Sequence, residues 1–403
     1  MTATAARPEA TATGMRSATT SYYLLLAATT ILLLVGLAVV LSSSSIVSIR
    51  VDNGNAYAGF VTQLIAFAVG LAALVVGARM PVKFWKRAAP AVLFGAMILL
   101  GVVLVTGYAV GGNKAWIRIA GFSLQPSEIA KLGLALYLGV VLSKFRKKLT
   151  NPRDIMVPGG IMAILVIGLV LAGKDMGTAM IMLVVVVVAF WVAGVPGRFF
   201  AMAAGLLGVG AVGLVFAAQS RVDRISQWAT GSCTDTAECW QQTHGTWALA
   251  SGGLWGLGPG MSREKWGWLP ASDNDYIFAI IGEEFGLIGT LLILAAYAMI
   301  LVAVTRIVHR STDLFVQIAA AAIGAWIVVQ ACVNIAVVLE LAPVTGVPLP
   351  LVSSGGSSLI MSMAAVGVLL SFARNEPGAP EALAARPSVV RRSLAVLSRG
   401  RRG

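Results

Sequence analysis

Residues 22–41 read YYLLLAATTILLLVGLAVVL, a run of twenty positions without a charged side chain. An α-helix of this length rises about 30 Å, the thickness of the hydrocarbon core of a bilayer. A secretory signal peptide has a shorter apolar core and a small-residue cleavage site, so we expect this run to remain as a transmembrane helix.

Nine further apolar runs follow, and together they predict an all-α, polytopic membrane protein of about ten transmembrane helices. We expect the helices at residues 22–41, 60–77, 91–110, 129–142, 155–172, 176–193, 200–217, 276–304, 314–339 and 359–372.

The composition supports this fold class. Of 403 residues, 58% are hydrophobic and 12% are charged, whereas soluble domains carry about 25% charged residues. The net charge of +13 does not indicate a nucleic-acid partner, because the Lys and Arg residues cluster in alternate short loops and in the tails. That pattern places those loops and both termini in the cytoplasm, next to an anionic lipid surface.

Three parts of the chain follow from this topology. Residues 1–21 form a disordered cytoplasmic tail, residues 22–374 the membrane domain, and residues 375–403 a flexible, basic cytoplasmic tail. The connection 111–125 and the much longer loop 219–274, between the seventh and eighth helices, lie outside. An uncovered loop of that length is usually functional.

The spacing of the cysteine and histidine residues says little about metal binding or catalysis. Cys233 and Cys239 share the large outer loop, where a disulfide and two free thiols are equally open interpretations, and Cys332 lies mid-helix as a packing residue. His244 and His309 fall on opposite sides of the membrane, so no metal-ligand spacing is present. The sequence identifies no protein metal site and leaves a divalent cation, Mg²⁺ or Mn²⁺, open as a cofactor.

Asp275 is the first candidate for chemistry, because it opens the eighth helix where membrane meets water. It has two interpretations of equal weight. In one, Ser272 is the N-cap and Asp275 completes a capping box. In the other, Asp275 is a catalytic carboxylate at the mouth of a cavity, with Asp273 as its neighbouring competitor.

Other charges lie within apolar segments. We expect Glu283 and Glu284 to form a hydrogen-bonded structural pair, with Glu283 about 12 Å deeper than Asp275. Lys131, one turn into the fourth helix, needs a counter-ion. The candidates are Glu128, Asp175 and Asp275, of which Asp275 is preferred.

Two irregular segments complete the outer face. Residues 252–260, GGLWGLGPG, follow no strand, so a bendable loop over the membrane is favoured over a nucleotide site. Residues 343–358 contain three prolines and end in SSGGSS; irregular backbone at this depth must line protein or a wet cavity. Its N–H groups and hydroxyls, including Ser353 and Ser354, suit a phosphate at a helix start.

Residues 121–131 (GFSLQPSEIAK), 269–284 (LPASDNDYIFAIIGEE) and 350–358 (PLVSSGGSS) together resemble the SEDS family of peptidoglycan glycosyltransferases, most closely its actinobacterial division members. The resemblance covers nearly the whole membrane domain in the right order. It implies an enzyme that polymerises lipid II into glycan strands on the outer face of the cytoplasmic membrane, at the division septum. An elongation polymerase of the same family is the near alternative.

The resemblance also implies site residues. Asp275 takes the position of the family's outer-loop aspartate and is the expected general base, and Lys265 matches the lysine that precedes it. We expect Lys265, Arg224 and Lys131 to meet phosphate charge. The remaining substrate-binding candidates are Glu128, Gln241, Ser353 and Ser354.

Some positions depart from the family pattern. Lys174 replaces a usual proline and Glu340 a usual glycine. Ala115 replaces a usual arginine, for whose charge Lys114 is the expected substitute.

The resemblance implies partners as well: lipid II, the glycan linked to undecaprenyl pyrophosphate, a class B penicillin-binding transpeptidase and other membrane proteins of the divisome. Two further functions stay open. A lipid II flippase would need charges through the membrane depth, and a scaffold would need only the transpeptidase.

Overall fold

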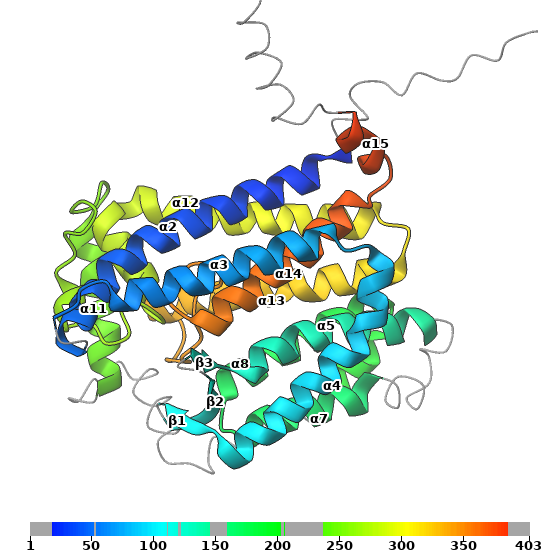
Figure 1. Cartoon of the computed structure of the whole chain (residues 1–403), viewed down its shortest axis with the longest axis horizontal. Coiled ribbons are helices and arrows are strands. Elements are labelled where there is room, and N and C mark those ends of the chain that lie inside the picture. The colour runs from blue at the N-terminus through cyan, green and yellow to red at the C-terminus, as the bar shows by residue number, and fades with distance from the viewer. Residues whose placement is uncertain are drawn as a thin grey trace, which may run out of the picture.

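The computed structural model describes residues 18–51, 54–110, 112–119, 122–145, 159–202, 205 and 237–385. Long helices lie side by side along the longest axis of the molecule (Figure 1). Seven helices among the described residues are long and apolar enough to cross a bilayer, so the predicted all-α polytopic membrane fold is confirmed. The predicted count of ten is untested, because residues 206–217 of the seventh span lie outside the described residues.

The helices agree with the predicted spans to within several residues at most ends. They are α2 Thr20–Val51, α3 Ala58–Arg79, α4 Val82–Thr106, α5 Pro126–Phe145, α7 Ile161–Ala172, α8 Met176–Ala193, α11 Ala237–Gly252, α12 Ile277–Arg310, α13 Leu314–Val338, α14 Gly356–Arg374 and α15 Ala379–Ala384, with a 3₁₀ turn at Glu264–Trp266.

The outer surface of this bundle is apolar. Leu34, Ile98 and Ile164 lie on three different helices, and each is more than 60% exposed. A soluble protein would bury such side chains, but a bilayer solvates them. The interior is built around α13, which packs against α5, α8 and α12 and whose Trp326 is fully buried.

The outer connection between α4 and α5 was predicted as a loop, but it forms a small antiparallel sheet. Its strands are β1 Tyr108–Val110, β2 Asn113–Ile119 and β3 Phe122–Leu124, in the order β1-β2-β3. Trp116 pairs with Tyr108 in the first ladder. The β-branched and aromatic residues of this stretch favour strands, and hairpin pairing satisfies its backbone.

The helix α12 is sharply bent at Gly286, which has φ 63° and ψ −160°. A β-carbon built on Gly282 would lie 3.3 Å from Cγ2 of Thr290, whereas a straight helix separates residues eight apart by about 12 Å. Residues 277–285, hereafter the outer half-helix, therefore do not continue the membrane-crossing direction of residues 287–310.

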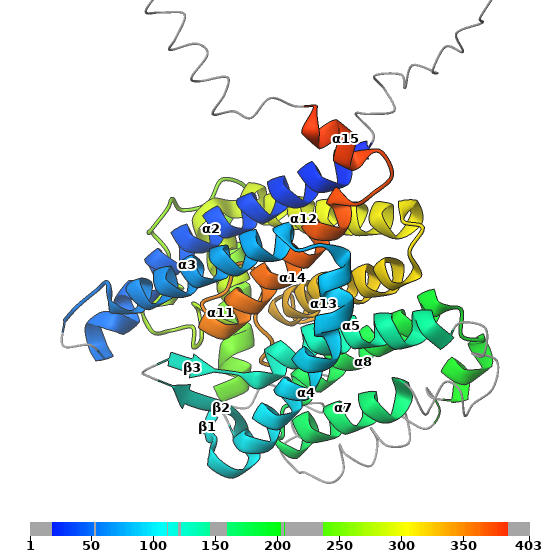
Figure 2. The same ribbon diagram turned by 45° about the vertical axis from the view of Figure 1, so that its right-hand side comes forward.

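The bend corrects a prediction about depth. Glu284, in the outer half-helix, accepts a hydrogen bond from Ser42, which lies about 33 Å along α2 from Thr20. The start of α2 lies at the end of the bundle that carries α15 (Figure 1; Figure 2 gives the view turned by 45°). Glu283 and Glu284 thus lie at the opposite end of the bundle, the end expected to face outward, and the prediction that Glu283 lies about 12 Å deeper than Asp275 on a straight membrane-crossing helix is wrong.

The glycine-rich segment 252–260 explains how the bend is tolerated. The N–H groups of Leu257 and Gly258 donate to the carbonyls of Glu283 and Glu284, at 2.9 and 3.0 Å. On the other side of the bend, the N–H groups of residues 287 and 288 donate to the carbonyls of residues 253 and 254. The loop therefore supplies the partners that the helix loses at Gly286.

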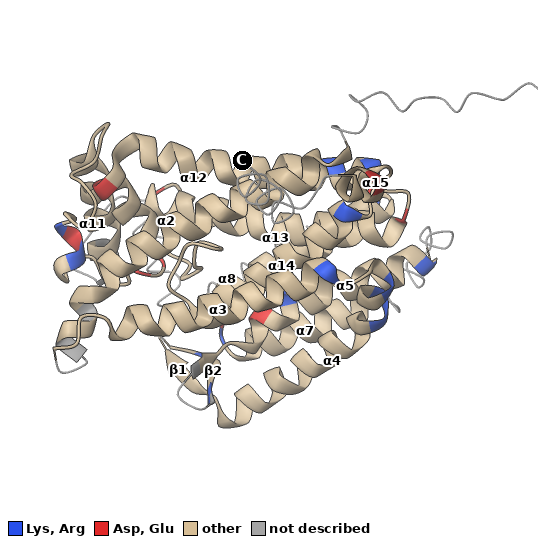
Figure 3. Ribbon diagram, turned by 45° about the horizontal axis from the view of Figure 1, so that its top comes forward, with Lys and Arg blue, Asp and Glu red and all other residues tan. Residues whose placement is uncertain are grey.

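Among the described residues, most Lys and Arg positions lie toward the end of the bundle with α15 (Figure 3). Residues 375–385, predicted as part of a flexible tail, are folded there: Ala379 and Ala382 are buried, and Arg310 Nε donates to Glu376 at 2.9 Å. Residues 386–403 lie outside the described residues.

Candidate functional site

The segment 273–275 is attached to the connection between α13 and α14. Ser353 Oγ donates to the carbonyl of Asn274 at 2.7 Å, and Ser354 Oγ donates to Oδ2 of Asp273 at 2.6 Å. The N–H of Ser354 also donates to the Asp273 carbonyl at 2.9 Å. The two serine hydroxyls, predicted to bind phosphate, here hold the segment that carries Asp275.

Asn334 of α13 completes this attachment. Its Nδ2 donates to the carbonyls of Asp275 and Val347, both at 2.8 Å. A β-carbon built on Gly346 would lie 3.8 Å from Oδ2 of Asp275. The Asp275 carboxylate therefore lies beside residue 346, where any side chain larger than hydrogen would be in van der Waals contact with it.

The capping interpretation of Asp275 is not supported. The outer half-helix has Tyr276 as its N-cap and no side-chain cap bond, although Ser272 is buried nearby. Oδ1 of Asp275 is buried and has no hydrogen-bond partner among the described residues. Burial first, and the nearby Asp273 carboxylate second, raise the pKa of Asp275 from 3.8 to about 6.

Lys131 is not the counter-ion of Asp275, so the preferred pairing is wrong. Its ammonium lies 2.8 Å from Glu128 Oε1 and donates to Gln330 Oε1 at 2.8 Å, and it stands 4.7 Å from the centroid of the Trp326 ring. Three residues along one helix bring Glu128 and Lys131 to the same face, so the pair is satisfied locally.

Gln330 connects this pair to the Asp275 region. Its Nε2 donates to the carbonyl of Pro348 at 2.8 Å, one turn of α13 from Asn334. Lys131 and Glu128 thus act on the site through the backbone that surrounds Asp275. Sequence reasoning missed Gln330 and Asn334, although two amides four residues apart in the second half of a largely apolar helix were a usable signal.

Asp175 caps α8, as its structural interpretation predicted. Its Oδ1 accepts from the N–H of Thr178, and its Oδ2 accepts from Nε2 of Gln125, both at 3.0 Å. A β-carbon on Gly177 would lie 2.7 Å from the carbonyl of Thr345. The start of α8 therefore packs against the same connection that surrounds Asp275.

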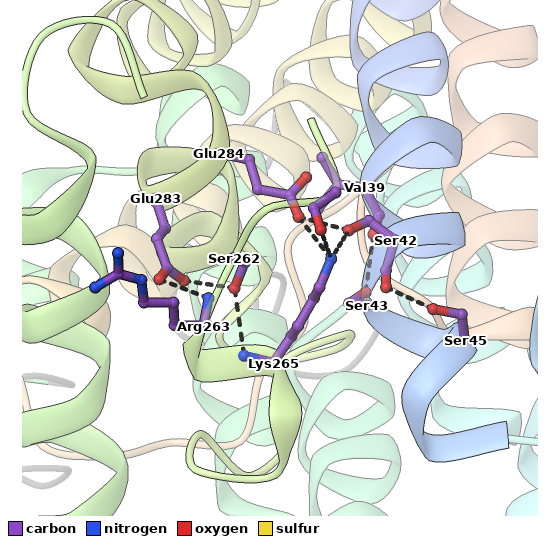
Figure 4. Close-up of polar contacts among 10 residues, drawn as sticks. Val39, Ser42, Ser43, Ser45, Ser262, Arg263, Lys265, Glu283 and Glu284 are labelled. Carbon is purple, nitrogen blue, oxygen red and sulfur yellow. Dashed lines mark hydrogen bonds and ion pairs between the residues drawn. The ribbon is translucent and has the colours of Figure 1, made fainter. Parts of the chain in front are cut away.

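Lys265 lies in a buried cluster at the far end of the outer half-helix (Figure 4). Its ammonium donates to Ser42 Oγ at 2.6 Å, to the carbonyl of Gly260 at 2.6 Å and to Glu284 Oε1 at 3.2 Å. These three contacts use all three donors of the ammonium. Lys265 thus joins the outer loop to α2 and α12 and has no donor left for a phosphate.

Glu283 anchors the neighbouring turn of the outer loop. It accepts hydrogen bonds from Ser262 Oγ and from the N–H of Arg263, the latter at 2.8 Å. The Arg263 guanidinium points away from the cluster (Figure 4). The structural interpretation of Glu283 and Glu284 is therefore the correct one, although the two do not pair with each other: Glu283 binds the loop, and Glu284 binds both the loop and α2.

The helix α11 lies in the predicted outer loop, beside the outer half-helix. Gly245 faces the ring of Tyr276, and a β-carbon there would lie 2.9 Å from it. Gln241, half-buried one turn earlier, is on the same side of α11. His244 pairs with Glu264 and packs against the rings of Trp240 and Trp268, which braces the segment leading to Asp275.

Two of the expected departures from the family pattern, Lys174 and Glu340, fall at positions with left-handed backbone. Lys174 has φ 67° and Glu340 has φ 60°. Proline cannot adopt the first value, and glycine adopts the second without strain. Lys114, expected to supply substrate-binding charge, instead donates to the carbonyls of residues 104 and 105 at the end of α4.

Arg224 and Cys233 lie outside the described residues, and so does the side chain of Cys239. Neither the predicted phosphate contact nor the disulfide is placed. Among the described residues, no group of three or more His, Cys, Asp or Glu side chains could hold a metal ion.

Comparisons with known proteins cover most of the chain. A family model described as "Cell cycle protein", FtsW/RodA/SpoVE, matches residues 23–377. The chain is 36% identical over 359 residues to the probable peptidoglycan glycosyltransferase FtsW of Mycobacterium tuberculosis, covering 88% of this chain and 68% of that protein. It is 35% identical over 315 residues to stage V sporulation protein E of Bacillus subtilis, covering 77% and 86%.

Solved structures share the fold. A chain from a study of polymerisation and crosslinking by a peptidoglycan synthase complex superposes with a TM-score of 0.70 at 23% identity, covering 88% of this chain and 97% of that one. The rod shape determining protein RodA of Thermus thermophilus gives 0.62 at 24% identity, covering 88% and 96%. By the extent of the family match and the identity to its members, this chain belongs to the FtsW/RodA/SpoVE family of membrane proteins.

Proposed function

We propose that this protein is a peptidoglycan glycosyltransferase that polymerises lipid II on the outer face of the membrane during cell division, with Asp275 as its general base. The observation that carries the assignment is the state of the Asp275 carboxylate. It lies at the outer end of the bundle with one oxygen unpartnered, and its pKa is raised to about 6. A base with a pKa near the working pH is the most effective.

The reaction needs one base. Asp275 takes the proton from the 4-hydroxyl of lipid II, whose oxygen then forms a bond to C1 of the sugar at the end of the growing strand. The bond from C1 to the diphosphate breaks, and undecaprenyl pyrophosphate leaves with the electron pair. Because a diphosphate is a good leaving group, no second carboxyl is required as an acid, in contrast to glycoside hydrolysis.

The diphosphate charge needs partners other than Lys265 and Lys131, whose ammonium groups already bind protein acceptors. The start of α14 is one, because its N-cap Gly355 offers no side-chain cap and lies beside Asn274. First-turn N–H groups of a helix bind anions. The exposed Lys174, next to the start of α8, and Arg224 of the outer loop are the cations assigned to this role.

The location and partners follow from the same assignment. Both tails belong in the cytoplasm, with residues 1–21 and 375–403 flanking the membrane domain, and the enzyme works at the septum. A structural relative comes from a complex that couples polymerisation to crosslinking, which supports a class B transpeptidase as partner. Other divisome membrane proteins are further expected partners.

Asp275→Asn tests the assignment directly. Purified wild-type protein and the variant, each with and without the transpeptidase, are given lipid II in vesicles with the substrate on both leaflets. We expect wild type to form polymer and the variant to lose at least about 100-fold of the rate, the usual contribution of a general base. Polymer formation by Asp275→Asn at the wild-type rate would remove Asp275 from this role.

The same vesicles distinguish a flippase. The buried pair Glu128–Lys131 favours transport, since it places charges within a membrane-crossing helix. Redistribution of lipid II without polymer, under every condition with the transpeptidase present, would identify a transporter and overturn the enzymatic assignment.

A further inference from the structure

The tip of the glycine-rich segment carries large apolar side chains that no part of the described chain covers. Trp255 is 80% exposed, Met261 64% and Leu254 62%. Residues of this size and polarity are unfavourable in water, and several together on one surface mark an interaction site.

The backbone holds these side chains outward. Gly252 and Gly256 approach α12 so closely that a β-carbon on either would lie 1.9 or 2.2 Å from the carbonyl oxygen of Gly282 or Glu284. The N–H groups of residues 287 and 288 bond the carbonyls of residues 253 and 254. Leu254 and Trp255 are thus attached on both sides to a helix and cannot turn inward without breaking these bonds.

The exposed tip continues a lipid-facing row. Directly after the bend, Leu287, Ile288, Leu291 and Leu292 of α12 are between 43% and 53% exposed, on a helix that crosses the membrane. Since the N–H of Ile288 bonds the carbonyl of Leu254, the tip lies at the outer end of that row.

We propose that the loop 253–261 inserts into the outer leaflet of the bilayer, with Leu254 and Trp255 at the level where lipid headgroups meet acyl chains. Trp side chains are enriched at this level, because the ring is apolar and its N–H bonds water or headgroups. The exposed guanidinium of Arg263, which points away from the buried cluster, suits the lipid phosphates. The bilayer is favoured over a protein partner because the tip is continuous with the surface that lipid already covers.

Insertion has a structural consequence for Asp275. The loop satisfies the broken backbone of α12, and the outer half-helix extends from that bend back to Tyr276. A loop held in the leaflet therefore sets the height of this half-helix, and of the carboxylate before it, relative to the membrane surface.

Nitroxide labels test the insertion without reading activity. The full chain, with Cys233 and Cys239 changed to Ser and Cys332 to Ala, receives a single Cys at 254 or 255 and is reconstituted in phosphatidylglycerol–phosphatidylcholine vesicles. Collision with oxygen, which partitions into lipid, is compared with collision with a water-soluble nickel chelate. Ile98→Cys on the exposed face of α4 is the lipid control, and Glu381→Cys on α15 is the water control.

We expect labels at 254 and 255 to favour oxygen over the chelate severalfold, as at 98 and opposite to 381. A ratio equal to that at 381 would overturn the proposal, and so would low collision with both reagents, which indicates cover by protein. A second measurement keeps the native cysteines: brominated lipids should quench the fluorescence of wild type more than that of Trp255→Phe. Equal quenching would contradict insertion, whatever the result for Asp275→Asn.

Discussion

The two ends of the outer half-helix carry acidic residues in opposite states. At its start, Asp275 has an unpartnered oxygen and forms no ion pair among the described residues. At its end, Glu284 is bound by Lys265 and Ser42, and Glu283 by Ser262 and the N–H of residue 263. All three are removed from bulk water to a large extent, so burial alone does not separate a reactive carboxylate from a structural one. The two kinds of carboxylate differ in the number of hydrogen-bond donors and cations that surround them.

This difference has a physical cause. A buried carboxylate that keeps its charge needs cations or N–H groups, and with them it is a weak base that stabilises the fold. Among the described residues, Oδ1 of Asp275 has no such donor, and the pKa of this carboxyl is raised, so it accepts a proton readily near neutral pH. The half-helix therefore separates the two tasks, with attachment at one end and chemistry at the other.

The largest expected effect is at the attached end. Glu284→Ala leaves the Lys265 ammonium buried without its counter-ion, and Lys265→Ala leaves the Glu284 carboxylate buried without its own. Each change should therefore lower the unfolding free energy by about 3–5 kcal/mol. Thermal unfolding in detergent measures this. The double variant Glu284→Leu/Lys265→Met removes both charges and should recover most of the loss. If the single variants unfold like wild type, the cluster does not hold the outer loop.

Asn334→Leu should affect the reactive end without removing its base. The change leaves the carbonyls of Asp275 and Val347 without their amide donor, which costs about 1–3 kcal/mol. Because the segment before the outer half-helix then shifts, we expect the rate of polymerisation to fall about 10-fold, in line with that cost. The midpoint of the pH profile should stay near 6, since the charges around Asp275 are unchanged. A large shift in that midpoint would mean that Asn334 acts on the charge of Asp275.

The pH profile tests the raised pKa. Polymerisation should increase with pH through about 6, as Asp275 loses its proton. Asp273→Asn keeps an oxygen for Ser354 but removes a negative charge, so the midpoint should move to lower pH. If the midpoint is the same in Asp273→Asn as in wild type, the Asp273 carboxylate is not a cause of the raised pKa of Asp275.

The unfolding free energy should show the opposite dependence on pH to the polymerisation rate. The folded state raises the pKa of Asp275, so it binds this proton more tightly than the unfolded state does. The resulting stabilisation is complete below the unfolded-state pKa of 3.8 and is lost as the pH rises through the folded-state pKa of about 6. At pH 7.5, Asp275→Asn should therefore raise the unfolding free energy by about 1–2 kcal/mol, after allowance for the partial exposure of the carboxylate. A variant less stable than wild type at that pH would contradict a destabilising charge at this position.

Much of the fold was predictable from local sequence. Apolar runs locate the long helices because each must match the bilayer, and the run 176–193 coincides with α8. The bend in α12 was not predictable in this way, because long apolar stretches lie on both sides of Gly286 and the run reads as one helix. The break depends on the loop 253–258, which supplies hydrogen bonds from residues about thirty positions earlier.

The site was predictable in its residue types and less so in its pairings. Position alone made Asp275 a candidate, and the resemblance chose between its two roles. The partner of Lys131 could not be assigned, because three acids were candidates, and Lys265 was expected to meet phosphate charge. Only the packing of α5 against α13, and of the outer loop against α2, gives their actual partners. Long-range pairing of this kind leaves no periodic signal in one sequence.

Glu340 extends the comparison to an exposed carboxylate, where the smallest effect is expected. Its backbone is left-handed, with φ 60°, and its Oε1 accepts from Thr246 Oγ1 at 2.7 Å. Glu340→Ala keeps the strained backbone and loses the bond, whereas Glu340→Gly loses the bond but relieves the strain. Glycine should therefore be the more stable of the two by about 1 kcal/mol, with polymerisation unchanged in both. If alanine equals glycine, the left-handed backbone is not retained in the variants, and the preference of the family for glycine here needs a cause other than backbone strain.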